Sequence, residues 1–303
     1  MKKHMYERTG QAPLSLGDFY EQARREVDLK DPQSLNALAL PLLRLAQDES
    51  LLLKFVNRGL ADWQRPERFH FYSPQSCQMI SDGVLAVRAN LWPLLPNDPR
   101  RRAILADALS YFDYHDHNFS FITANIFGPG YETEMYRYDR SRMVGHVGEK
   151  VDLAYLGRHR LDHGTVLFYE ECADVHVQLP PSALSASLNL MLVKPESPLM
   201  NQHYFDIDKG EISGYVGATS DKRVNALHFA RHFHDDQTAD LLTRILEAHP
   251  CSRTRVEAGR ILASYKGEAA ISASSRESML KDELARALWA RRPEQCAPAG
   301  SGA

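Results

Sequence analysis

Two histidines separated by a single residue, His115 and His117, stand in the middle of the segment 114–119. Successive side chains of a β-strand point to opposite faces, so residues i and i+2 share a face. If the segment is extended, both imidazoles therefore point the same way. A third histidine, His176, lies in the strand-like run 174–178. Three imidazoles that converge would form a divalent-metal site with coordination positions left for a substrate.

Carboxylates and phenols near these histidines could complete such a site. Glu132, Glu134 and Tyr136 alternate along the run 131–138, so they would share one strand face. The Gly-Pro-Gly turn at 128–130 predicts a hairpin between this run and the run 119–127. If the hairpin turns that face inward, one glutamate becomes a fourth ligand. Tyr136 and Tyr169 are then candidate proton donors, or groups that orient oxygen, if their hydroxyls reach the interior.

The elements that must position these residues follow from the periodicity of the apolar residues. Helical spacing over residues 1–67 predicts a helical N-terminal region, in which Ser15 and Asp18 form a capping box. Short strand-like runs divided by turn residues fill residues 68–220 and predict an antiparallel β-barrel or jelly roll. Helical spacing returns over residues 221–296, and residues 297–303 are expected to be a disordered tail. The predicted fold is an all-β core with helical extensions at both ends.

Composition narrows the function classes. A formal net charge of −3 gives no electrostatic reason to expect nucleic acid or an anionic membrane as partner. The N-terminal residues lead into no apolar stretch of the kind found in secretory signals, and no run is long enough to cross a bilayer. Four widely spaced cysteines form no C-x-x-C pair. A cytoplasmic setting is therefore expected.

The His-x-His pair, the later His176 and the many short strands together resemble the cupin superfamily over roughly residues 69–216. The resemblance implies a cupin-like jelly-roll barrel in which His115, His117 and His176 hold a metal. Asn189 stands on a following strand, where cupins often keep an asparagine. Two features depart from the pattern. The carboxylate that usually follows the pair is replaced by the residues 120–122, and no Pro-x-Gly precedes the third histidine.

The resemblance implies that the cofactor is Fe(II) first, with Mn, Ni, Cu or Zn as alternatives, because a three-histidine cupin site is similar to those of thiol dioxygenases and related oxygenases. The expected activity is that of a mononuclear non-haem iron oxygenase. It would take dioxygen and a small polar metabolite, such as an amino acid or derivative, as its substrates. Arg137, Gln178 and Asn189 are the candidate substrate-binding residues. Cupins are often dimers, so a homodimer is also raised.

Two other function classes stay open at the level of sequence. One is a redox-neutral metal-dependent cupin isomerase or lyase, and the other is a non-enzymatic protein that binds a metabolite or a partner. A second histidine group, His228, His232 and His234, lies on a helical run but lacks the glutamate of the H-E-x-x-H pattern. A solvated helix is the expectation there.

Overall fold

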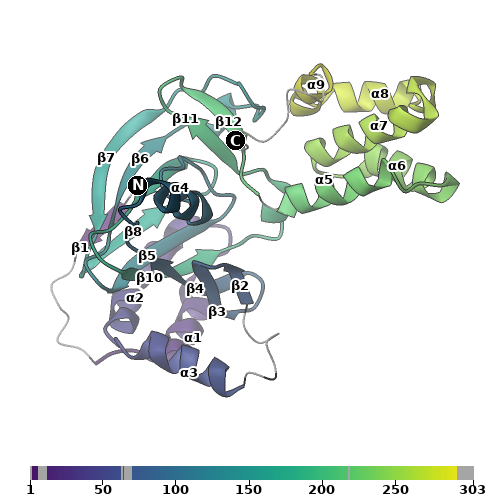
Figure 1. Ribbon diagram of the computed structural model, residues 1–303. Coiled ribbons are helices and arrows are strands. Elements are labelled where there is room, and N and C mark those ends of the chain that lie inside the picture. Colours follow the sequence, from purple (N-terminus) through teal and green to yellow (C-terminus); the bar gives the residue numbers. More distant parts are fainter. Residues whose placement is uncertain (1, 6–11, 63, 65–69, 218, 292–303) are drawn as a thin grey trace. The chain divides into compact units, whose positions relative to one another are not determined.

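The computed structural model describes residues 2–5, 12–62, 64, 70–217 and 219–291 (Figure 1). Contacts divide the chain into two compact units. The first comprises Met1–Tyr138 and Leu153–Pro195, and the second comprises Asp139–Asp152 and Glu196–Ala303. The boundaries predicted near residues 67 and 220 mark where helices give way to strands and strands to helices. That these two positions are also domain boundaries stays a prediction.

A large antiparallel sheet forms the centre of the first unit (Figure 1). Every neighbouring pair of its strands runs antiparallel. In spatial order its strands are β1 (Lys2–Met5), β8 (Thr165–Tyr169), β5 (Ser120–Phe127), β10 (Ser185–Leu192), β4 (Leu85–Trp92), β3 (Ser76–Ser81) and β2 (His70–Ser73). The strands β1 and β3 were not predicted from the sequence.

A second antiparallel sheet faces the first. Its strands, in spatial order, are β7 (Ala154–Leu161), β6 (Tyr131–Arg137) and β9 (Asp174–Leu179). From β5 to β10 the chain passes repeatedly between the two sheets, and rings from both meet between them. The Tyr131 ring lies 4.5 Å from that of Trp92, and the Tyr169 ring lies 4.5 Å from that of His176. This is the jelly-roll-like β-core that the sequence predicts.

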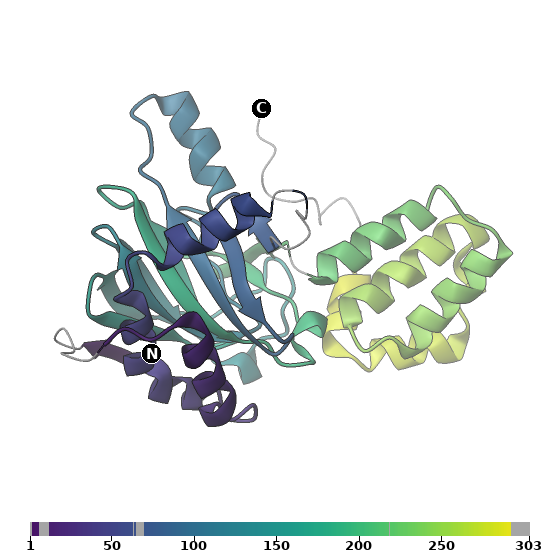
Figure 2. The same cartoon turned by 90° about the horizontal axis from the view of Figure 1, so that it is seen from below.

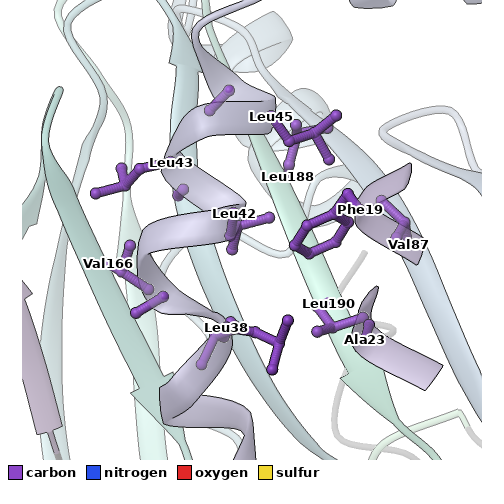
Figure 3. Close-up of a cluster of buried hydrophobic side chains, with 14 of the residues drawn as sticks. Phe19, Ala23, Leu38, Leu42, Leu43, Leu45, Val87, Val166, Leu188 and Leu190 are labelled. Atoms are coloured by element: carbon purple, nitrogen blue, oxygen red, sulfur yellow. The ribbon is translucent and has the colours of Figure 1, made fainter. Parts of the chain in front are cut away.

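Helices cover the other face of the large sheet, as Figure 2 shows from below. They are α1 (Leu16–Glu26), the 3₁₀ helix η1 (Pro32–Leu38), α2 (Ala39–Ala46) and α3 (Leu51–Ala61). The Ser15 hydroxyl caps α1 by accepting from the Asp18 N–H at 3.1 Å, which is half of the predicted capping box; the Asp18 carboxylate accepts from the Ser15 hydroxyl at 2.7 Å. Leucines at helical spacing pack on alternate residues of the strands, such as Leu42 near Leu188 and Leu190 (Figure 3). Both faces of the sheet are therefore buried.

The prediction of a hairpin at residues 128–130 is wrong, because the strands on either side of this turn do not pair with each other. The strand β5 pairs with β8 and β10, whereas β6 pairs with β7 and β9. The Gly-Pro-Gly turn instead carries the chain from one sheet to the other. Gly128 and Gly130 have φ values of +73° and +76°, which glycine adopts at little cost. A Cβ on Gly130 would lie only 1.7 Å from the Leu161 carbonyl oxygen.

We expect the substitution Gly130→Ala to destabilise the first unit far more than Gly83→Ala does. Both positions have positive φ, which costs an L-residue about 1–2 kcal/mol. At Gly83 no heavy atom lies within 4 Å of an added Cβ, so only this backbone term applies. At Gly130 the added methyl also displaces the backbone at the end of β7. Urea unfolding of both variants measures the difference, and equal losses would show that close approach is unimportant at this turn.

The remaining helix of the first unit is α4 (Pro99–Ala108), which begins at the cap Asp98. The second unit contains the hairpin β11 (His203–Asp206) and β12 (Glu211–Tyr215), whose strands pair across the predicted turn at 208–210. Its helices are α5 (Thr219–Ala230), α6 (Asp236–Ala248), α7 (Ser252–Lys266), α8 (Ala273–Leu280) and α9 (Glu283–Trp289). Its described residues also include the short 3₁₀ helices η3 (Arg140–Arg142), η4 (Ser197–Leu199) and η5 (Glu268–Ala270).

Within the described part of the chain, every helix is too short or too polar to cross a membrane. The predicted disordered tail, residues 297–303, lies outside the described residues.

Candidate metal centre

Backbone pairing brings His115 and His176 together. The His115 N–H donates to the His176 carbonyl at 3.0 Å, and the His176 N–H donates to the His115 carbonyl at 2.9 Å. Residues that exchange two such bonds stand directly opposite each other, with side chains on the same face. The two imidazole ring centres are accordingly 4.5 Å apart. The segment around His115 thus runs antiparallel to β9 as a single bridge, and the regular strand β5 begins only at Ser120.

His117 completes the group. Its carbonyl accepts from the Cys172 N–H at 2.8 Å, which holds the segment alongside the turn before β9. Its Nε2 lies 3.0 Å from the Nε2 of His176. One ligand nitrogen from each of His115, His117 and His176 lies within 4.8 Å of the other two. The convergence predicted from the i, i+2 spacing and the later strand is confirmed.

The donor set fits a divalent transition metal. Bonds of about 2.0–2.1 Å to two imidazoles at an angle near 90–109° put their nitrogens roughly 2.8–3.4 Å apart. The 3.0 Å separation between the His117 and His176 nitrogens lies in this range. That contact needs one ring N–H as donor, and removal of this proton leaves both nitrogens able to bind a cation. Three neutral nitrogen ligands suit Fe, Ni, Cu or Zn better than Mg or Ca.

Burial favours the neutral form of two of these imidazoles, those of His115 and His176. His176 is 1% exposed and His115 is 8% exposed. Desolvation lowers the pKa of His115 below its usual value. Desolvation, followed by the charges of His115, His117 and Arg88, lowers the pKa of His176 well below its usual value. A neutral imidazole is the form that binds a metal, so burial prepares the ligands.

Two neighbouring groups orient the rings. The Asp113 carbonyl lies 2.8 Å from the Nδ1 of His115, and a carbonyl only accepts, so Nδ1 carries the proton and Nε2 is left as the ligand. The Gln178 side-chain amide lies 2.8 Å from the Nδ1 of His176 and donates its N–H there. When the Nε2 of His176 binds a metal, Nδ1 carries the proton and the amide must present its oxygen instead.

We expect Gln178→Leu to weaken metal binding about 10- to 100-fold, the usual loss when the partner of a metal-bound histidine is removed. Leucine leaves the Nδ1 of His176 buried without its amide partner. Calorimetric titration of the metal-free protein with Co(II) measures the effect. Gln22→Leu, on the helix α1, is the matched control and should change the affinity less than threefold. Equal affinities for Gln178→Leu and wild type would remove this residue from the site.

Aromatic rings line the interior beside the histidines. Three interior residues are register partners on neighbouring strands of the large sheet: Met191 on β10, Phe121 on β5 and Tyr169 on β8. The Phe121 and Tyr169 rings stack at 4.5 Å with 9° between their planes, and Phe121 also lies 5.2 Å from His117. Burial raises the pKa of Tyr169 well above its usual value, so the phenol stays protonated beside His176. The predicted position of Tyr169 near the metal centre agrees with this geometry. Its role as a proton donor stays a prediction.

A polar row crosses the same face of the sheet one step further along the strands. Arg88, Asn189 and Thr123 are register partners on β4, β10 and β5. The Asn189 amide oxygen accepts from the Arg88 Nη2 at 3.1 Å, and the amide nitrogen donates to the Thr123 hydroxyl at 2.8 Å. Arg88 was not among the predicted site residues. Its signal was a lone charge within the apolar run 84–89, at an alternate position that must face the interior.

The structure does not bring Glu132 or Glu134 to the histidines. Met135 is the register partner of His176 and is fully buried, so the glutamates at the alternating positions point to the opposite face of β6. There Glu134 accepts from the Tyr114 hydroxyl and forms an ion pair with Arg158, each at 2.7 Å. The prediction of a glutamate ligand depended on a hairpin that does not form.

Tyr136 shares this outward face. Its ring lies 5.8 Å from that of Tyr114 and 5.0 Å from that of Tyr155. The structure therefore corrects its predicted place at the centre. Arg137 pairs with Glu170, which directly follows β8, and lies 3.5 Å from Asp174, the first residue of β9. Its predicted role in substrate binding, like those of Gln178 and Asn189, stays a prediction.

The second histidine group does not converge. His228 contacts Glu257 at 2.9 Å, whereas the His234 ring stacks on Tyr265 at 3.9 Å. In the described ranges of the chain, the histidines 115, 117 and 176 are the one group of three or more potential ligands close enough to hold a metal.

No protein-family model matches this sequence, and no curated protein is similar to it. Solved structures with some likeness include the DMSP lyase DddQ from Ruegeria pomeroyi DSS-3, at 16% identity and a TM-score of 0.25 over 42% of this chain and 48% of the lyase. Another is hydroquinone 1,2-dioxygenase from Sphingomonas sp. TTNP3, at 9% identity and a TM-score of 0.28 over 41% of this chain and 68% of the dioxygenase. Scores this low support no inference about this chain.

The molecule's own architecture defines the class of site. Two facing antiparallel sheets form a jelly-roll-like barrel, and three histidines that could hold a metal ion converge between them.

Proposed function

We propose that this protein is a mononuclear metal-dependent enzyme of cupin type, and specifically a non-haem iron oxygenase acting on a small polar metabolite such as an amino acid or derivative. The observation that carries the proposal is the convergence of three imidazoles, with no carboxylate among them. Three ligands leave positions of the metal open, as catalytic sites require. A bound Fe(II) would supply the means to activate dioxygen, and would bring it next to the substrate.

The chain's own residues have three tasks in this proposal. His115, His117 and His176 hold the metal, while the Asp113 carbonyl and Gln178 fix the orientation of two of their rings. The rings of Phe121 and Tyr169 exclude water from one side of the centre.

A redox-neutral lyase or isomerase is the second candidate, because a buried proton donor stands beside the centre. The Tyr169 ring lies 4.5 Å from that of His176, and burial holds its phenol in the protonated form. A phenol placed in this way could give a proton to a leaving group or an enolate without any oxidant. The same residue would serve either chemistry, so the distinction requires an experiment.

The test begins with metal-free protein that is loaded with Fe(II) under argon. Nitric oxide, a stand-in for dioxygen, should then bind and produce the electron paramagnetic resonance signal of a high-spin iron nitrosyl. A metal that is held with all its positions filled by the protein would give no such signal, and this would overturn the proposal of a catalytic centre. His117→Ala is the matched negative control.

Screening the common amino acids in air and under argon separates the two candidates. An oxygenase forms product only in air and consumes dioxygen in step with it. A lyase or isomerase forms the same product under argon, which would replace the first candidate by the second. Protein reloaded with Zn(II) should be inactive in the first case and can stay active in the second, because Zn(II) has no redox chemistry.

A further inference from the structure

A positive charge stands in the interior beside the proposed metal. Arg88 lies on the face of β4 that points toward the small sheet, between the inward-facing Ala86 and Asn90. Its guanidinium donates to the Asn189 amide oxygen at 3.1 Å, and it lies over the Phe119 ring at 5.9 Å from the ring centre. Phe119 in turn lies 4.6 Å from His117. One aromatic ring therefore separates the guanidinium from a metal ligand.

The residues around the centre differ in burial. Arg88, His117 and Phe119 are each half-buried, whereas His115 and His176 are buried. A small molecule that arrives from solvent would therefore meet the Arg88 guanidinium and the His117 side of the metal together.

Charge indicates what kind of molecule this would be. Three neutral imidazoles leave the full double positive charge on a divalent metal, and the guanidinium adds a further positive charge nearby. The buried carboxylate of Asp116, which accepts from the Tyr138 hydroxyl at 2.7 Å, lies beside His115 and offsets one of these positive charges, so that the region keeps a net positive charge. Two cationic centres close together in a region of low dielectric favour an anionic ligand that reaches both. Arginine also binds carboxylates through two parallel hydrogen bonds.

We propose that Arg88 is the substrate-anchoring residue of this site, and that the substrate carries a carboxylate, which Arg88 binds while a neighbouring group of the substrate meets the metal. The inference rests on the proposed function, since it presupposes a metal at the three histidines.

Co(II)-loaded protein tests this proposal without knowledge of the substrate. The probes are acetate and phenylacetate, each compared with its neutral amide, and calorimetry together with the visible Co(II) spectrum reports binding. The phenyl group is included because of the aromatic wall at Phe119 and Phe121. Wild type should bind at least one carboxylate of the two in clear preference to the corresponding amide. Absence of any such preference would overturn the role of Arg88.

The substitution Arg88→Gln should weaken carboxylate binding about 10- to 100-fold, which corresponds to the loss of a charged bidentate contact. Its Co(II) affinity should be equal to or higher than that of wild type, because a repelling charge is removed. Arg158→Gln, on the outward face of the small sheet, is the matched control and should bind both as wild type does. Unchanged carboxylate binding in Arg88→Gln would contradict the proposal.

Two further outcomes, failure of the variant to fold and failure of the protein to bind metal, can be told apart from a wrong role for Arg88. If Arg88→Gln fails to fold, Arg88→Lys keeps the charge without the planar fork, and should reduce carboxylate binding about threefold to tenfold; unchanged binding would again contradict the proposal. If wild type binds no Co(II) at all, the proposed metal centre itself is wrong, whichever anion is tested. The metal titration and the anion titration thus fail independently.

Discussion

Metal-free His176→Ala protein is expected to bind Co(II) more than about 100-fold more weakly than wild type, a larger loss than removal of an orienting neighbour causes. The reason is that one of three ligand nitrogens disappears from a buried position, where no other described side chain replaces it. Water can occupy the position, but it is a weaker ligand than imidazole for these metals. Calorimetric titration of both proteins at equal pH measures the change.

The control is His163→Ala, which removes an exposed histidine from the turn before β8 and should leave Co(II) binding unchanged. Because His176 is buried, His117→Ala is a useful second variant at a half-buried position. Thermal unfolding of the metal-free proteins shows whether each variant is folded. Co(II) affinity within threefold of wild type in both folded ligand variants would exclude these histidines as the metal site.

The substitution Phe19→Ala should lower the free energy of unfolding of the first unit by about 3–5 kcal/mol, the usual cost of removing a buried aromatic side chain. Phe19 on α1 is completely buried between the N-terminal helices and the outer face of the large sheet, near Val87 and Leu190 (Figure 3). The cavity would lie on the face opposite the metal centre. Hydrogen exchange of the amides of β5 and β10 measures stability within this unit alone.

Leu53→Ala is the matched control for Phe19→Ala. Leu53 lies on α3 and is 61% exposed, so its truncation should change the stability by about 0.5 kcal/mol or less. Similar losses in the two variants would mean that the N-terminal helices do not form part of the core of the barrel.

Most of the strands and the three histidine ligands could be predicted from the sequence. The strands β5, β8, β9 and β10 begin within one residue of their predicted starts, because alternating or continuous apolar runs end at clear turn residues. His115 and His176 could be predicted to meet because each is in an extended run, and antiparallel strands bring such runs together. The pairing partner of each run was not contained in this local pattern.

The errors come from pairing between distant segments. The turn at 128–130 has the composition of a hairpin, yet it joins two different sheets. The register of β6 against β9 then decides that Met135, and not Glu134, faces His176. A shift of one residue would reverse this outcome, and local composition does not determine register. Arg88 was missed for the same reason, since only the sheet order places β4 beside β10 and its interior row.

Elemental analysis of protein purified under argon tests the central claim most directly. The account predicts about one divalent transition-metal ion per chain in wild type, with iron as the principal metal, and its loss in His115→Ala. His115 is suited to this comparison because the Asp113 carbonyl already fixes its ligand nitrogen. Wild-type protein that contains no metal and takes up no Fe(II), or an unchanged metal content in folded His115→Ala, would contradict the account.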